Sequence, residues 1–199
     1  TILQLINLVR RQASTSDIED LLKRDPALSF NLLRFINSAS FGLRTEITSF
    51  RHAVMLLGLK RLFKWAALLL TTSCGGETAS AVATTAVTRG RLMELLGAEL
   101  LSPEECDNAF VVGIFSMLDA MLGVPMQTAL DAMSLPDSVN QALAHRAGPL
   151  GPFLTLTLAC ETGDDTRFAE SAHALGLNSN QINWAHLQAL AWAESIANG

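Results

Sequence analysis

The chain has 199 residues, of which 49% are hydrophobic, and its formal net charge is −5. This length supports one sizeable hydrophobic core, while no apolar run reaches the roughly 20 residues that a membrane-spanning helix needs. The three cysteines, Cys74, Cys106 and Cys160, are far apart and odd in number, which argues against a disulfide framework. We therefore expect a cytoplasmic protein with a single domain over residues 1–199.

The charges are divided unevenly along the chain. Residues 1–70 carry ten Lys or Arg and five Asp or Glu, a net charge of +5, whereas residues 71–199 carry four and fourteen, a net charge of −10. An acidic majority argues against a general nucleic-acid-binding protein. The basic residues of the first part could still contact an acidic partner.

Helical patterns fill the first 70 residues. Apolar residues recur on one helical face over residues 2–9, and Ser16 and Glu19 have the spacing of a capping box for a second helix. Asp25 suits the N-cap of a third helix, because its side chain can accept a hydrogen bond from a free backbone N–H. Ser49 suits the N-cap of a fourth, whose apolar face would hold Ala53, Leu56, Leu57, Leu59 and Phe63. That helix is wholly apolar over residues 66–70, so we predict that it is the central buried helix.

Helical patterns continue through the second part of the chain. An alanine-rich helix is expected over residues 79–96, ending at Gly97, and Ser102 begins a capping box for a second buried helix that runs to Gly123. Shorter helices are expected over residues 125–133, 136–145 and 149–162, and two more close the chain, the last capped by Ser179. No segment shows convincing strand alternation. The sequence predicts an all-α fold, a compact multi-helix bundle of about ten helices.

Residues 25–70 carry the most specific pattern. The strings DPALSFNLLRFINSASFG and ITSFRHAVMLLGLKRLFKW combine a D-P-x-L helix start, an N-S-A-x-F-G turn and an A-x-x-x-L-G-x-x-x-L run. At this spacing they resemble the HDOD domain of bacterial signalling proteins, and FSMLDAMLG at 115–123 resembles the subgroup fused to EAL domains. We expect structural roles, above all in ending the helix and fixing the turn, for the signature residues Asp25, Pro26, Asn37, Ser38, Phe41 and Gly42.

The resemblance implies an HD-domain-like bundle and a non-catalytic regulatory output domain that acts by protein–protein contacts in bacterial cyclic di-GMP signalling. It also implies an EAL domain before Thr1, so that the chain would be a fragment of a longer signalling protein. The expected partner is a protein, with a fused EAL domain as one candidate and a second copy of the chain as another. Nucleic acid and membrane partners are not expected. The sequence identifies neither the partner nor the signal.

The HDOD family is related to HD-domain metal phosphohydrolases, in which an adjacent His-Asp pair helps to hold divalent metal ions. This sequence contains no His-Asp doublet, and its four histidines are scattered. Against the metal-binding segment of those enzymes, Ser116 and Met117 stand in place of His and Asp, and neither suits a hard metal ion. We therefore expect no catalytic residue, no metal site and no cofactor, and we predict that the chain is not an enzyme.

An alternative is a degenerate HD-type pocket that still binds a nucleotide or another small ligand as a sensor. Its candidate lining is Arg34, Arg91, Asp119 and Glu161. Asp119 lies in an otherwise apolar stretch, where a buried carboxylate needs a partner such as Arg34 or Arg91. A structural ion pair or an N-cap is the simpler interpretation of Asp119, and the same choice applies to Glu161.

Lys60, Arg61 and Lys64 form the densest cluster of charge. Lys60 and Lys64 are four residues apart and share a helical face. The cluster is either the solvated edge of an apolar helix or a contact surface for an acidic protein partner. A helix-turn-helix interpretation of residues 31–62 fits poorly, because the second helix offers aliphatic side chains where base recognition needs Arg, Asn or Gln.

Overall fold

The computed structural model describes residues 2–37, 47–72 and 79–198, and within these residues it contains twelve α-helices and no strand. The first six are α1 (Ile2–Arg10), α2 (Thr15–Lys23), α3 (Pro26–Ile36), α4 (Phe50–Thr71), α5 (Ala79–Gly97) and α6 (Pro103–Phe115). The last six are α7 (Leu118–Leu122), α8 (Met126–Asp131), α9 (Asp137–His145), α10 (Gly151–Thr162), α11 (Asp165–Ala174) and α12 (Ser179–Asn198). The predicted all-α bundle is confirmed.

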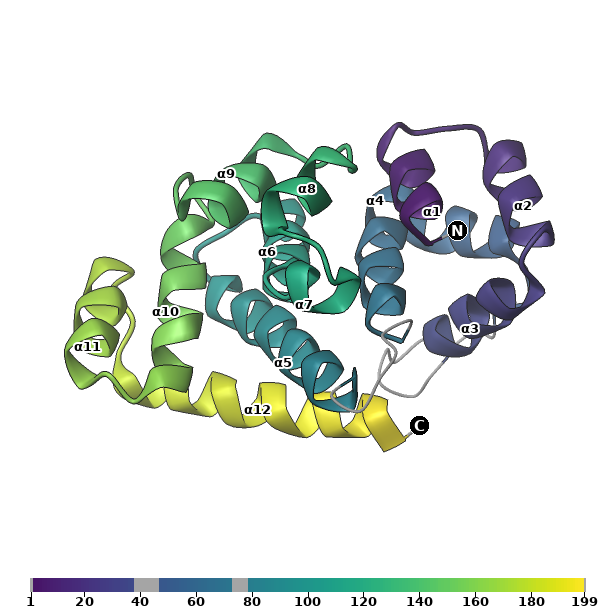
Figure 1. The fold of residues 1–199 in the computed structure, drawn as a ribbon. Coiled ribbons are helices and arrows are strands. Elements are labelled where there is room, and N and C mark those ends of the chain that lie inside the picture. The colour runs from purple at the N-terminus through teal and green to yellow at the C-terminus, as the bar shows by residue number, and fades with distance from the viewer. Residues whose placement is uncertain (1, 38–46, 73–78, 199) are drawn as a thin grey trace.

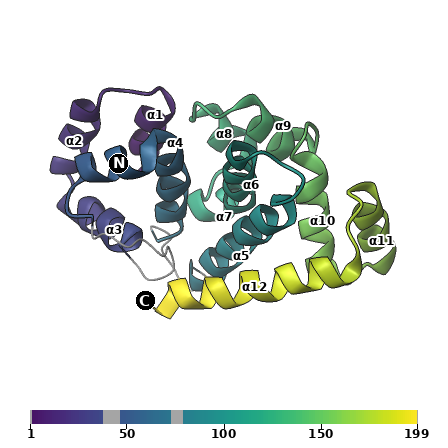
Figure 2. The same cartoon turned by 180° about the vertical axis from the view of Figure 1, so that it is seen from behind.

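The helices form two groups that are connected by α4. Figure 1 shows α1, α2 and α3 gathered around α4 at one end of the molecule, α5 to α9 in the middle, and α10 and α11 at the other end. The long last helix, α12, runs along one side of the second group and packs against α5 (Figures 1 and 2). Because α4 contacts both α1 and α6, it links the two groups.

Helix α4 is central, as predicted, but only over its second half. All ten residues from Leu62 to Thr71 are buried. The helix is kinked at Gly58, which has a φ of 73° and a ψ of 159°, a conformation that is essentially restricted to glycine. Before the kink, Leu56 is 53% exposed, so its predicted place on the buried face is wrong. The kink breaks the helical spacing on which that prediction rested.

Two glycines allow α5 and α6 to pack closely. A Cβ atom on Gly113 would lie 2.4 Å from the backbone nitrogen of Gly90, and one on Gly90 would lie 2.9 Å from the carbonyl oxygen of Phe110. Hydrogen in place of a side chain therefore permits the backbones to touch. Residues 109–115 of α6 are all buried, which confirms the second buried helix.

That second buried helix is shorter than predicted. α6 ends at Phe115, where the Ser116 hydroxyl donates a hydrogen bond to the carbonyl oxygen of Gly113 at 2.6 Å. The chain resumes as the five-residue helix α7, which ends at Gly123 in the left-handed conformation. This division is one reason that the structure has twelve helices in its described part where about ten were predicted.

The capping residues were predicted with mixed success. Asp25 accepts a hydrogen bond from the Leu28 N–H at 3.0 Å, Ser49 caps α4, and Ser102 forms the expected capping box. The predictions for Ser16 and Ser179 are wrong. The cap of α2 is Ser14, and the side chain of Asn178 accepts the corresponding bond at the start of α12 at 2.9 Å.

Asn37 connects the end of α3 to the chain just before α4. Its side-chain amide donates to the carbonyl oxygen of Ile47 at 2.6 Å and accepts from the Ile47 N–H at 2.7 Å. The amide therefore pairs with both backbone groups of one residue, and these bonds hold the end of α3 against the segment before α4. Ser38, Phe41, Gly42 and Cys74 lie outside the described residues.

None of the helices in the described part of the chain combines the length and the apolar character needed to span a membrane.

Candidate functional site

The position compared with the metal-binding His-Asp pair lies at the end of α6. There the Ser116 hydroxyl accepts a hydrogen bond from Nη1 of Arg89 at 3.0 Å. The Nε and Nη2 atoms of Arg89 donate to the two carboxylate oxygens of Glu161 at 2.8 and 2.7 Å. One guanidinium thus joins α5, α6 and α10, in the bidentate geometry that makes arginine–carboxylate pairs strong.

The arginine that binds Ser116 has a second cation nearby, Arg146. Burial lowers the pKa of Arg146, and the nearby charges of Arg89 and Arg167 lower it further. A hydroxyl group that already binds the guanidinium of Arg89 does not fit a divalent metal ion, which prefers carboxylate or imidazole ligands and is repelled by cations. Among the described residues, no three or more His, Cys, Asp or Glu side chains are placed to hold a metal.

The four residues predicted to line a degenerate pocket do not converge. Arg34 is exposed on α3, and Asp119 is exposed on α7, where it accepts a hydrogen bond from the Ala120 N–H at 2.8 Å. The expectation of a buried Asp119 is therefore wrong, because α6 ends before it and α7 turns its carboxylate to solvent. Arg91 pairs with Glu94 at 2.7 Å, and Glu161 pairs with Arg89. No hydrogen bond or ion pair joins any two of the four.

The three basic residues of α4 have different environments. Lys60 is exposed and forms an ion pair with Glu104 at 2.6 Å, and Arg61 is exposed. Lys64 is only 8% exposed. The interpretation that places Lys64 on a solvated edge or contact surface with Lys60 is therefore wrong, since the kink and the packing of α5 and α6 enclose it.

Lys64 is the centre of a buried charge network. Its Nζ atom donates to Glu94 and lies 3.4 Å from Asp107, while Glu94 also accepts from Arg91. The Nζ atom is 4.5 Å from the centroid of the Phe110 ring, a distance suited to a cation–π contact. Burial raises the pKa of Asp107, and Lys64 opposes this rise. The network stabilises the junction of α4, α5 and α6.

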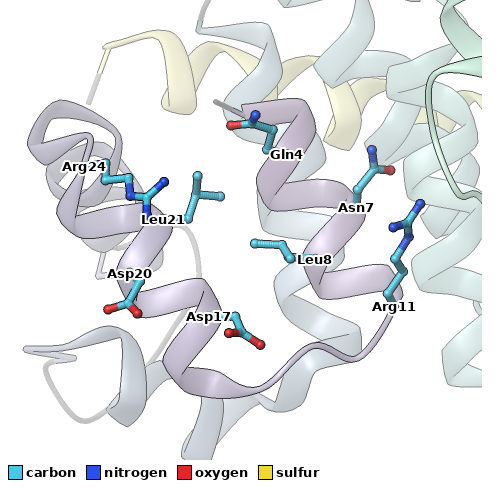
Figure 3. A pocket seen from close by; sticks show the side chains of 8 residues that line it. All are labelled: Gln4, Asn7, Leu8, Arg11, Asp17, Asp20, Leu21 and Arg24. Atoms are coloured by element: carbon cyan, nitrogen blue, oxygen red, sulfur yellow. The ribbon is translucent and has the colours of Figure 1, made fainter.

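A groove of about 500 Å³ separates α1 from α2. Figure 3 shows Leu8 and Leu21 between the two helices, with Arg11 and Arg24 toward opposite ends and two carboxylates, Asp17 and Asp20, along α2. The two positive and two negative charges balance. This groove therefore has no net charge with which to select a charged ligand.

Helix α12 exposes an apolar face. Trp184, Leu187 and Leu190 follow one another at three-residue spacing and are 65%, 61% and 46% exposed. The opposite face of the helix is buried through Ile182, Ala185, Ala189 and Ala193, and α12 packs against α5. We call the three exposed residues the α12 stripe. Contiguous exposed apolar side chains mark contact surfaces more often than scattered ones do.

The structure thus adds two features that the sequence interpretation missed, the Arg89 bridge and the α12 stripe. Arg89 carries no local signal, because its partner Glu161 is 72 residues away. The α12 stripe does carry a signal in the sequence, because Trp184, Leu187 and Leu190 form an apolar row separate from the row of buried residues on the same helix.

Comparison with known proteins gives a family match and two relatives. The family model described as HDOD domain matches residues 1–129. A protein of Vibrio cholerae named cyclic di-GMP phosphodiesterase CdgJ is 28% identical over 179 residues, covering 90% of this chain and 41% of that protein. The Bacillus subtilis protein YuxH, named as uncharacterized, is 25% identical over 197 residues, covering 97% of this chain and 47% of that protein. No solved structure matches the chain.

These matches correct one prediction, and they cover only part of each relative. The prediction that the chain is not an enzyme is wrong, because a relative matched over 90% of the chain carries the name of a phosphodiesterase. The chain spans less than half the length of either relative, so more than half of each relative lies outside the match.

Proposed function

Because this chain belongs to the HDOD family, we propose that it is a regulatory domain of cyclic di-GMP signalling that acts by contacting another protein domain. The link to cyclic di-GMP is supported by the relative from Vibrio cholerae, whose name describes a phosphodiesterase for this nucleotide. The partner is a domain that takes part in cyclic di-GMP turnover, and an EAL domain is the candidate that the family resemblance suggests.

The α12 stripe is the observation that carries the contact. Trp184, Leu187 and Leu190 keep about half or more of their surface in solvent, while on the opposite face Ile182 is buried and the larger Trp192 and Ile196 pack against the core, partly buried. Over residues 179–197 the charged or titratable side chains are those of His186 and Glu194 alone. Such a face recognises a partner through apolar area and shape rather than through charge. Tryptophan, the residue type of Trp184, is enriched among the residues that contribute most of the binding energy at interfaces.

A substitution pair in the complete natural protein tests the proposal. Leu187→Ser removes apolar area from the stripe, and Leu100→Ser is the matched control, because Leu100 is 49% exposed and lies in the connection between α5 and α6. We expect Leu187→Ser to change the rate of cyclic di-GMP hydrolysis by at least about threefold, the effect of roughly 0.7 kcal/mol. Leu100→Ser should leave the rate of hydrolysis equal to that of the wild type within experimental error.

A second measurement follows contact directly. Acrylamide quenches an exposed tryptophan, and Trp184 is more exposed than Trp65 or Trp192. Quenching should be weaker in the complete protein than in residues 1–199 alone, because the partner domain covers Trp184. Equal quenching in the two proteins, or equal rates for the two leucine variants, would show that the α12 stripe contacts no regulatory partner.

A further inference from the structure

A second hollow, separate from the groove of Figure 3, lies where α1, α4, α5 and α6 meet. Its volume is about 760 Å³, within the range of about 300–1,000 Å³ that is typical of small-molecule sites. Part of its wall is apolar, formed by Leu57, Leu59, Phe63 and Leu95. Leu57 and Leu59 flank the kink at Gly58, so the glycine conformation sets how both meet the hollow. We call this hollow the α4 pocket.

The α4 pocket carries an excess of positive charge. Its wall holds four cations, Arg10, Lys60, Arg61 and Arg91, and three carboxylates, Glu94, Glu104 and Asp107. Lys64 does not line the pocket, but it pairs with two of these carboxylates, Glu94 and Asp107. The wall alone has a net charge of +1, and with Lys64 counted the cluster has a net charge of +2, in a chain whose net charge is −5. This local excess favours an anionic ligand.

Two of these cations are not neutralised by contact. Lys60 pairs with Glu104, Arg91 pairs with Glu94, and Lys64 pairs with Glu94 and Asp107. In the described part of the chain Arg10 and Arg61 form no ion pair. Arg61 acts on Asp107 only as a nearby charge. The excess of two charges therefore resides on these two arginines.

Arg10 is already held in position. Its Nε atom donates to the carbonyl oxygen of Ser134 at 3.3 Å, and its guanidinium carbon lies 5.2 Å from the centroid of the Phe63 ring. Burial lowers the pKa of Arg10, and the charge of Glu104 opposes this. No hydrogen bond of the described residues uses the two terminal nitrogens of Arg10, which are the atoms that form the fork for a phosphate.

We propose that the α4 pocket binds a phosphate-bearing small molecule of nucleotide size, with Arg10 and Arg61 on the phosphate groups and the apolar wall against the base. Planar guanidinium groups bind phosphate through paired hydrogen bonds, and aliphatic and aromatic side chains suit the face of a base. The site differs from the degenerate pocket considered above, with which it shares only Arg91. It also lies apart from the α12 stripe, because no residue of α12 lines it.

Isothermal titration of residues 1–199 tests the proposal with three probes: inorganic phosphate, GMP and cyclic di-GMP. We expect at least one nucleotide to bind more tightly than inorganic phosphate, because only a nucleotide also uses the apolar wall. Arg61→Glu should weaken that binding by at least about tenfold, since it removes one phosphate contact and adds repulsion. The matched control is Arg24→Glu, which makes the same charge change at an exposed arginine of the balanced groove. It should change the affinity by less than about twofold, because Arg24 does not line the α4 pocket and exposed charges are screened by salt.

Arg10→Lys provides a second variant that keeps the charge but removes the planar fork. It should weaken nucleotide binding by about threefold or more while leaving thermal unfolding close to that of the wild type. Failure of all three probes to bind, or equal weakening by Arg61→Glu and Arg24→Glu, would overturn the proposal. Binding of inorganic phosphate as tightly as the nucleotides would overturn the nucleotide part. The Leu187→Ser variant should bind the probes as tightly as the wild type does, so the titration tests the α4 pocket independently of the α12 stripe.

Discussion

The contact between Gly113 and Gly90 makes a sharp prediction about stability. In Gly113→Ala the new Cβ atom would lie 2.4 Å from the backbone nitrogen of Gly90 and 2.5 Å from both the Gly90 Cα and the Arg89 carbonyl carbon. Ordinary van der Waals contact begins at 3.4 Å, so α5 and α6 must separate by about 1 Å at this point. All three crowded atoms belong to the backbone, and no side-chain rotation can relieve them.

The expected cost follows from two opposing effects. Overpacking a core costs about 1–3 kcal/mol and sometimes more, and separating two buried helices also loses contacts along the rest of their interface. Alanine in place of glycine within a helix recovers about 1 kcal/mol of helix propensity. Because the clash is with backbone, we expect the gross cost to lie above this range, at about 4 kcal/mol, which leaves a net loss of about 3 kcal/mol. For a domain of this size that corresponds to a fall of roughly 6–12 °C in melting temperature.

Urea unfolding followed by circular dichroism measures this loss, and the chain supplies its own controls. In Gly97→Ala the new Cβ would meet the end of the Leu101 side chain at 2.7 Å, and that side chain can rotate. We therefore expect Gly97→Ala to cost less than about 1 kcal/mol. Gly90→Ala should fall between the two, because it meets one side-chain atom and one backbone oxygen at 2.9 Å. If the Gly113→Ala variant were as stable as the Gly97→Ala variant, the backbones of α5 and α6 would not be in contact at Gly113 and Gly90.

Three further predictions concern polar contacts. Asn37→Ala should lower the free energy of unfolding by about 2 kcal/mol in urea unfolding, because it removes two hydrogen bonds to Ile47. Asn37→Asp should also be destabilising, because it keeps an acceptor for the Ile47 N–H but sets a carboxylate oxygen, which cannot donate, against the Ile47 carbonyl oxygen. A double-mutant cycle with Arg89→Gln and Glu161→Gln should give a coupling of about 1–2 kcal/mol, and a coupling near zero would show that the bridge does not form in solution. Burial raises the pKa of Asp107 above its usual 3.8, so the folded state binds this proton more tightly than the unfolded state does. The stability contributed by Asp107 should therefore be lost as the pH rises from below 3.8 through that raised pKa, and Asp107→Asn should flatten this part of the unfolding curve against pH.

Local signals explain which parts of the fold could be predicted from the sequence. Asp25 and Ser102 each stand as a single strong cap before an apolar pattern, and each begins its helix as predicted; Ser49 also caps as predicted, although Thr48 stands beside it. The failures at Ser16 and Ser179 occur where several residues that can cap lie side by side, in Ser-Thr-Ser and Asn-Ser-Asn. There the choice of cap depends on how the helix packs, which local sequence does not contain.

Contacts between distant helices explain what the sequence could not predict. Lys64 was interpreted as a surface residue because charge is usually solvated, yet Glu94 and Asp107 neutralise it from two other helices. Asp119 was interpreted as buried because its neighbours are apolar, yet α6 ends just before it. In both cases the deciding fact is where a helix kinks or ends and which helix lies opposite.

Helix α12 shows how a pattern can be present and still be ambiguous. It carries two apolar rows, and spacing alone does not say which one faces the core. The buried row includes three alanines, Ala185, Ala189 and Ala193, whose small side chains let α12 pack against α5, while the larger Trp184 and Leu187 remain outside. Close packing selects the row of small residues and leaves the bulky row available for a partner.

The two proposed sites also differ in their relation to the family. The residues that line the α4 pocket lie between Val9 and Asn108, all within the part of the chain that the HDOD model matches, whereas the α12 stripe lies beyond residue 129. If the pocket serves ligand binding, we expect arginines equivalent to Arg10 and Arg61 throughout the family, while the face of α12 varies with the partner. Titration of a second HDOD domain with the same three probes checks this. Binding in this chain alone would make the pocket a property of one protein rather than of the fold.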